Sequence, residues 1–162
     1  MNQISQQDRW FIVKQLLLLT EKEVKHLNQT SNRIKAIKPD LHWIESLEKN
    51  IECSEMLDAF ISRFARLQDS LGDKLLPALL RVSLESTGSQ LDNLLRAEKL
   101  GWIESADRWV EIRVLRNRLV HDYMNSAEDL LQALIAALDS VSVLIETQSR
   151  LASYAGKFKD NA

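Results

Sequence analysis

Residues that interrupt helices are scarce in this chain, which has four glycines and two prolines among its 162 residues. Between them Leu, Ala, Glu, Lys, Arg and Gln dominate, and these residues favour helices. No stretch keeps the alternation of apolar and polar residues that a half-buried strand would show. The sequence therefore predicts an all-α protein.

Local signals place the helix boundaries. The segment SQQD (5–8) resembles a capping box and predicts a first helix that runs to about Ile37, just before Pro39. A second helical stretch covers 40–84, with a break near Cys53 or Gly72 and with Pro77 in the first turn of a helix that opens around Asp73.

Three further helices are expected to begin at GSQLD (88–92), SADRW (105–109) and SAEDLL (126–131). Gly101 is expected to end the first of these, and the last should reach about Lys157. The pattern predicts one domain over residues 1–162, an up-and-down helical bundle of about four main helices with short connecting helices.

The apolar residues of these segments predict its core. The run WFIVKQLLLL (10–19) is interrupted by Lys14 and is too short to span a membrane, so we expect neither a signal peptide nor a membrane anchor but the buried stripe of the first helix. In 40–84 the expected buried residues are Trp43, Ile44, Leu47, Ile51, Met56, Leu57, Phe60, Ile61, Phe64 and Leu67.

Composition excludes several classes of function. A net charge of -2 argues against a globally basic nucleic-acid-binding protein, so contact with RNA would need a local patch. Cys53 is the only cysteine, and His26 and His42 lack the spacing of metal ligands. We expect a cytoplasmic protein with no metal and no cofactor.

The octapeptide RNRLVHDY (116–123) concentrates chemistry-bearing residues in a segment that reads as helix. On a helix from Ala106 to about His121, the side chains of Trp109, Ile112, Leu115 and Leu119 share one apolar sector, and Arg116 falls inside it. Arg116 and His121 are about 140° apart on such a helix. They can converge if the helix ends near His121 or if a second copy contributes a residue.

These residue types suit metal-free cleavage of a phosphodiester. The histidine can exchange the proton of a ribose 2′-hydroxyl at neutral pH. The guanidinium of Arg116 can hold the phosphate, and Asn117 can orient either group. Tyr123 can donate a hydrogen bond to phosphate or stack on a base.

The octapeptide resembles the Arg-x4-His-x-Tyr signature of HEPN-domain proteins, the toxin half of HEPN/MNT toxin-antitoxin pairs. Arg116, His121 and Tyr123 match the signature, and Asn117 matches the polar residue that usually follows its arginine. The whole of 107–123 is similar to this family, and 63–76 is similar to the second-helix segment of its nucleotidyltransferase substrate-binding branch.

The resemblance implies a homodimer whose two motif copies face a shared cleft. It implies a metal-independent endoribonuclease that uses the 2′-hydroxyl of RNA and leaves a 2′,3′-cyclic phosphate. It also implies a partner of the minimal nucleotidyltransferase type, the antitoxin, which can inactivate such a toxin by transferring AMP to the motif tyrosine, here Tyr123. No membrane is involved.

Structural roles remain open for the same residues. Arg116 could form an ion pair with Glu111, Asp107 or Asp122, His121 could be a structural histidine, and Tyr123 could cover the edge of the core. The whole chain could then be a non-catalytic partner module of a minimal nucleotidyltransferase, with the motif as an interaction or AMPylation site.

Two secondary site candidates are Arg63 and Asp122, whereas Arg66 and Asp69, three residues apart, are expected to form a structural pair. Four arginines against two carboxylates in 105–121 predict positive potential along the motif helix. That potential suits single-stranded RNA, and it equally suits an acidic partner.

Overall fold

The computed structural model describes residues 3–121 and 126–160 of the chain, with the side chains of 159 and 160 left undescribed. In these residues all regular structure is helical, and no strand occurs, which confirms the predicted all-α bundle. The elements are α1 (Gln6–Ile37), α2 (Leu41–Ser46), the 3₁₀ turn η1 (Leu47–Lys49), α3 (Ile51–Asp69), the π-helical turn η2 (Ser70–Leu75), α4 (Leu76–Val82), α5 (Gln90–Lys99), α6 (Ala106–His121) and α7 (Ala127–Asp160).

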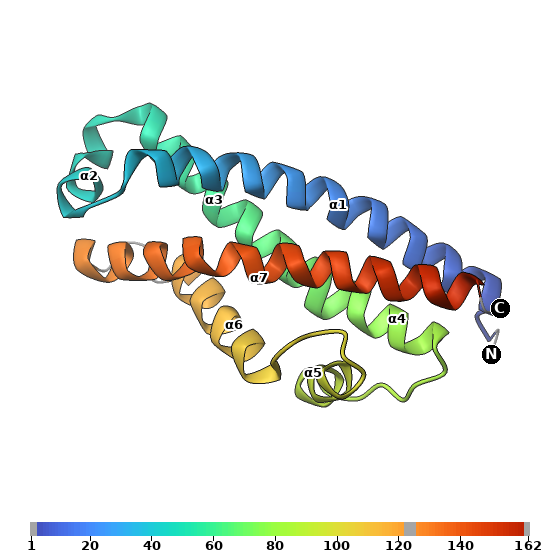
Figure 1. Cartoon of the computed structure of the whole chain (residues 1–162). Coiled ribbons are helices and arrows are strands. Elements are labelled where there is room, and N and C mark those ends of the chain that lie inside the picture. The colour runs from blue at the N-terminus through green and yellow to red at the C-terminus, as the bar shows by residue number, and fades with distance from the viewer. Residues whose placement is uncertain (1–2, 122–125, 161–162) are drawn as a thin grey trace.

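The long helices alternate in direction (Figure 1). α1 and α7 run side by side along the length of the molecule, and α3 with α4 crosses behind them, while α5 and α6 lie along the lower edge in that view. α7 is long and apolar enough to cross a bilayer by length and composition alone, and half of its most apolar stretch is buried in the bundle.

Predicted caps define most helix starts. Ser5 and Asp8 form the expected capping box of α1, and Ser89 and Asp92 form a second one at α5. Ser126 Oγ accepts a hydrogen bond from the backbone N–H of Asp129 at 3.1 Å at the start of α7. The sequence therefore located these three starts correctly.

The stretch 40–84 breaks near Cys53, as predicted, where Asn50 ends the first part and caps α3. At Gly72 the chain continues through the wide turn η2 into α4, which begins at Leu76 rather than at Asp73 and holds Pro77 in its first turn, as predicted. Such a turn accommodates Pro77, which lacks an N–H and would crowd the carbonyl of the preceding turn in a regular helix.

The core draws on every α-helix and on η2, together with Trp102 and Ile103 between α5 and α6. Most of the residues predicted to be buried in 40–84 pack in or against it, but Ile51 is 72% exposed because it occupies the first position of α3. The run 10–19 also departs from its prediction. Val13 is fully buried, whereas Phe11, Ile12, Leu18 and Leu19 are exposed.

Candidate functional site

The motif occupies the last turns of α6, which the core holds in place. Trp109, Ile112, Leu115 and Leu119 are all buried, as the helical spacing predicts. The helix starts at Ser105, whose Oγ accepts a hydrogen bond from the N–H of Arg108 at 3.1 Å. These contacts fix the rotation of the helix and therefore the directions in which Arg116, Asn117 and His121 leave it.

Arg116 is bound by a carboxylate of another helix. Its Nε and Nη2 donate to Asp69 Oδ1 and Oδ2 at 3.2 and 2.8 Å, a bidentate pair between α6 and the end of α3. The side chains of Arg116 and Asp69 are 23% and 34% exposed, so the pair is half-buried but reachable from solvent. Asp69 therefore fixes where the guanidinium points.

Two of the three partners expected from sequence for this ion pair, Glu111 and Asp107, were therefore wrong, and the third, Asp122, lies outside the described residues. Glu111 pairs with Arg108 at 3.0 Å instead, and no ion pair joins Asp107 to Arg116 in the part of the chain that the structure describes. Arg66, expected to pair with Asp69, donates to Ser62 Oγ at 3.3 Å. The local sequence around Arg116 could not indicate its true partner, because Asp69 and Arg116 are 47 residues apart.

Asn117 lies close enough to orient the arginine. Its Oδ1 accepts a hydrogen bond from Arg116 Nη1 at 3.3 Å, and its side chain is exposed. With Asp69 on one side and Asn117 on the other, the guanidinium is held by two acceptors. This arrangement leaves N–H groups of Arg116 that have no partner among the described residues and could meet an anionic ligand.

Arg116 opens onto a groove of about 520 Å³ between α3 and α6. The groove also contains Arg66. Its only side-chain partner among the described residues is the hydroxyl of Ser62, so no carboxylate there neutralises its positive charge. Sequence reasoning left open that Arg66 and Asp69 line the cleft but favoured a structural pair, and both residues line this groove. The groove is lined by Asp58, Ile61, Ser62, Ala65, Arg66, Asp69, Arg116, Leu119 and Val120.

His121 does not line this groove. It is exposed at the last residue of α6, on the face opposite the core. The same face carries Val110, Val114 and Asn117, spaced four, three and four residues apart up to His121. Val110 and Val114 are 41% and 54% exposed, so this face is uncovered in a single copy of the chain. We call it the free face of α6.

One of the two secondary candidates, Arg63, is separated from the groove. Arg63 donates to the His26 carbonyl at 3.1 Å and to Thr30 Oγ1, so it ties α3 to α1 and does not line the groove. Asp122 and Tyr123 lie outside the described residues.

Ion pairs offset most of the positive charge expected along α6. Arg108 pairs with Glu111, Arg113 pairs with Asp73 at 3.0 Å, and Arg116 pairs with Asp69. The expected positive potential along the helix is therefore weaker than the sequence count suggests.

A buried carboxyl lies next to the arginine's anchor. Ser70 follows Asp69 in the chain, and its Oγ donates to Glu23 Oε1 of α1 at 2.9 Å in the protein interior. Burial raises the pKa of Glu23 above its ordinary value, and the Ser70 hydrogen bond and the charge of Arg66 act in the opposite direction. Glu23 Oε2 is buried without a hydrogen-bond partner among the described residues.

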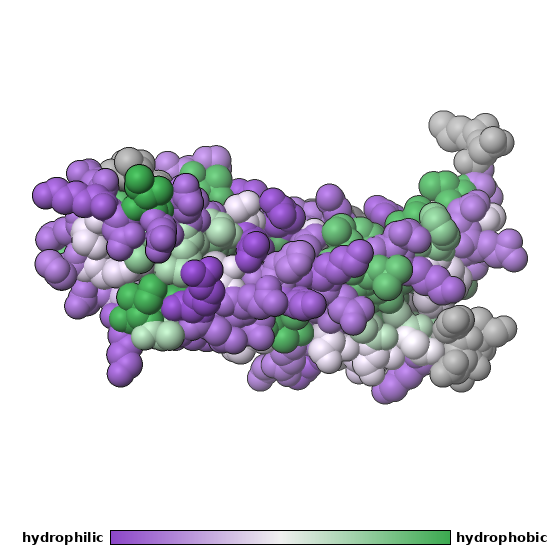
Figure 2. All heavy atoms as spheres, turned by 90° about the horizontal axis from the view of Figure 1, so that it is seen from above, coloured by the Kyte–Doolittle hydropathy of each residue, from purple (hydrophilic) through white to green (hydrophobic). Residues whose placement is uncertain are grey.

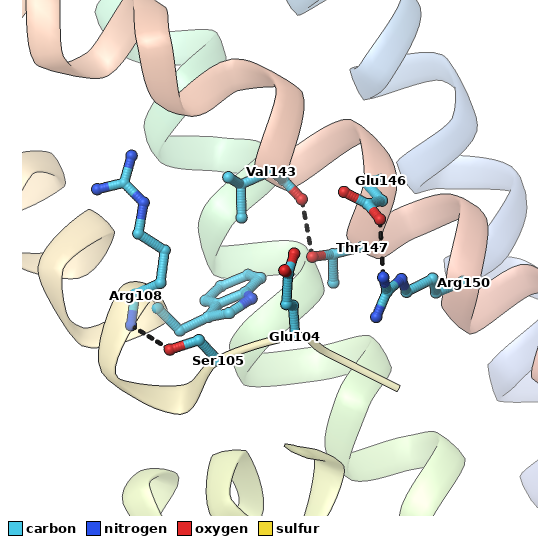
Figure 3. A pocket seen from close by; sticks show the side chains of 8 residues that line it. Glu104, Ser105, Arg108, Val143, Glu146, Thr147 and Arg150 are labelled. Atoms are coloured by element: carbon cyan, nitrogen blue, oxygen red, sulfur yellow. Dashed lines mark hydrogen bonds and ion pairs between the residues drawn. The ribbon is translucent and has the colours of Figure 1, made fainter. Parts of the chain in front are cut away.

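A second cavity, of about 290 Å³, lies between the start of α6 and α7 (Figure 3). Its arginines are already engaged, since Arg150 pairs with Glu146 at 2.8 Å and Arg108 contacts Glu111 and Ser140. Thr147 Oγ1 donates to the carbonyl of Val143 in its own helix at 2.8 Å. No nucleophile is paired with a base there, so we do not regard it as the catalytic candidate.

Comparisons with protein-family models, with curated proteins and with solved structures find no match for this chain. In residues 3–121 and 126–160, no group of three or more His, Cys, Asp or Glu side chains could hold a metal ion.

Proposed function

We propose that this chain is an HEPN-type toxin that cleaves RNA without a metal ion and acts as a homodimer. The observation that carries the proposal is the bidentate anchoring of Arg116 by Asp69 at the rim of an open groove, with Asn117 as a second acceptor. A guanidinium fixed in advance can stabilise the growing negative charge of a phosphate in the transition state without reorganising.

In the proposed reaction His121 removes the proton of a ribose 2′-hydroxyl. The 2′-oxygen attacks the adjacent phosphorus while the bond from phosphorus to the 5′-oxygen breaks. The leaving 5′-oxygen takes up a proton, and the products are a 2′,3′-cyclic phosphate and a 5′-hydroxyl end. Arg116 holds the phosphate, and Asn117 keeps the guanidinium oriented.

The second copy provides the convergence that one chain lacks. Arg116 leans towards α3, whereas His121 lies on the free face of α6. Pairing two free faces antiparallel about a two-fold axis near residue 119 would set His121 of one copy opposite Asn117 of the other, beside Arg116. Val114, five residues from that axis, is the nearer of the two exposed valines that a second copy could cover.

An RNA-cleavage assay in EDTA tests the activity. We expect Arg116→Ala and His121→Ala each to lower the rate by about 10²- to 10⁴-fold. Arg118→Ala on the same helix and His42→Ala, at an exposed histidine of α2, are the matched controls and should cleave as the wild type does. Equal cleavage by all five proteins would refute the assignment.

A second function is favoured by the charge balance of the groove. Because Asp69 already neutralises Arg116 and His121 lies outside the groove, the motif could instead serve as the interaction or AMPylation site of a non-catalytic partner of a minimal nucleotidyltransferase. Co-purification with such an enzyme and ATP, followed by intact-mass measurement, tests this. AMP on the wild type but not on Tyr123→Phe, with RNA left intact, would favour the second function over the first.

A further inference from the structure

The first half of α1 exposes apolar side chains that the sequence had assigned to the core. Phe11 is 63% exposed and Ile12 is 42% exposed, although the next residue, Val13, is fully buried. Ile4, just before the helix, is 57% exposed as well. Figure 2 looks onto the α1 side of the molecule and shows hydrophobic side chains in the half where α1 begins, as well as at the other end. Several exposed apolar side chains close together on one helix mark a contact site for another molecule.

Part of this surface forms one wall of a groove, which we call the α1–α4 groove. Two adjoining hollows of about 300 and 450 Å³ share Ile12, Ala78 and Arg81, so they form one continuous depression between α1 and the segment η2–α4. A hydrogen bond from Gln6 Nε2 to the Val82 carbonyl, 2.8 Å long, joins the two walls at one end. The floor is apolar and the depression is held open by packed helices.

The rim of the α1–α4 groove carries positive charge that nothing in the described residues offsets. Arg9, Lys74 and Arg81 line it, and none of them forms an ion pair within the described part of the chain. The one carboxylate in the groove, Asp73, is engaged by Arg113 at 3.0 Å and by Gln90. The groove therefore combines an apolar floor with a cationic rim.

We propose that the α1–α4 groove docks an acidic amphipathic helix of a partner protein. Apolar residues at helical spacing on the partner would contact Ile12, Phe11 and Ala78, and its flanking carboxylates would meet Arg9, Lys74 and Arg81. This inference concerns a surface on the α1 side and does not depend on the proposed nuclease activity.

Other occupants fit the groove less well. Two copies of this chain meeting groove to groove about a two-fold axis would set the cationic rims against each other. RNA would find cations, but Phe11 is the one aromatic side chain among the described residues that line the groove, so its bases would have little to stack on. An anionic bilayer would match the charge, but a concave groove between two helices suits an inserted helix better than a flat surface.

Two synthetic peptides of about 18 residues test the proposal by fluorescence anisotropy. Both carry leucines at i, i+3, i+4 and i+7, and they differ only in having glutamate or lysine at the flanking positions. We expect the glutamate peptide to bind the wild type at least about tenfold more tightly than the lysine peptide, and its binding to weaken as salt is raised.

Two groove variants and one control locate the site. Arg81→Glu and Ile12→Glu, both at exposed positions, should each weaken binding of the glutamate peptide about tenfold or more. Lys49→Glu makes the same type of charge change in η1, outside the α1–α4 groove, and should leave binding unchanged. Circular dichroism tests whether each variant is folded. If Ile12→Glu does not fold, Arg81→Glu alone tests the site.

Three outcomes would overturn the proposal. The first is equal binding of both peptides, or binding that survives Arg81→Glu. The second is a wild-type dimer that Ile12→Glu converts to a monomer, which would assign the groove to a second copy. The third is binding to phosphatidylglycerol vesicles that Arg81→Glu abolishes, with no binding of the glutamate peptide, which would assign it to a membrane surface.

Discussion

The position of Arg116 depends on one residue that is far away in sequence. Asp69 binds its guanidinium through two oxygens, and Asn117 accepts from a third nitrogen. In a half-buried setting, removing one partner of such a pair leaves the other incompletely solvated. The same contact therefore supports both the stability of the bundle and the proposed orientation of the site.

A double-mutant cycle measures this contact. We expect Asp69→Ala and Arg116→Ala each to lower the free energy of unfolding by about 1 to 3 kcal/mol in urea, and the double variant to lower it by clearly less than the sum. Arg150→Ala with Glu146→Ala, an exposed pair within α7, is the control cycle and should be close to additive. Additive effects at 69 and 116 would show that the pair does not hold the arginine.

Glu23 makes the stability of the fold depend on pH. Because burial raises its pKa above the ordinary value of 4.5, the folded chain holds a proton that the unfolded chain releases. The stability gained in this way is fully present below pH 4.5 and is lost as the pH rises through the raised pKa. Arg66, Lys74 and Asp69 are the charged groups that act on it.

Glu23→Gln removes this titration while keeping the shape and the acceptor for Ser70. We expect the variant to unfold at a higher temperature than the wild type at neutral pH, with the difference shrinking towards pH 4.5 and below. Thermal melts followed by circular dichroism at several pH values give the comparison. A difference that is constant with pH, or that grows on acidification, would contradict the role given to this carboxyl.

At the scale of the element, α6 presents two unlike faces. One packs its apolar sector into the core, and the other is the free face with Val110, Val114, Asn117 and His121. If this face pairs with its copy, a charge introduced on it would lose its water at the contact and oppose association. The oligomeric state of a variant with such a charge therefore shows whether the free face forms the dimer contact.

We expect the wild type to sediment as a dimer at micromolar concentration and Val114→Glu as a monomer with reduced RNA cleavage. Leu91→Glu introduces the same charge at a similarly exposed apolar position of α5, 51% exposed, and should leave the dimer intact. Analytical ultracentrifugation makes the measurement. A monomeric wild type, or a Val114→Glu dimer, would remove the proposed shared cleft.

At the scale of the whole molecule, the sequence predicted what depends on neighbours along the chain. The caps at Ser5, Ser89 and Ser126 and the buried sector of α6 follow from spacings of three and four residues, so helix starts and the rotation of α6 could be predicted. The architecture followed from these elements.

What the sequence could not predict depends on segments that meet only in the fold. The partner of Arg116 comes from another helix, and the wide turn η2 shows no distinctive residue pattern of its own. The run 10–19 holds more apolar residues than one face of α1 can bury, so periodicity alone could not say which of them remain outside. Candidate residues were thus identified by type before their neighbours were known.

Two adjacent residues at the end of α3 each contact a distant part of the chain. Asp69 faces outwards to α6, and the next residue, Ser70, faces inwards to α1. A substitution at either position must satisfy a neighbour 47 residues away, in opposite directions along the sequence. Drift in homologous chains should therefore be slowest here, and replacements at 69 or 70 should be accompanied by matching changes at 116 or 23.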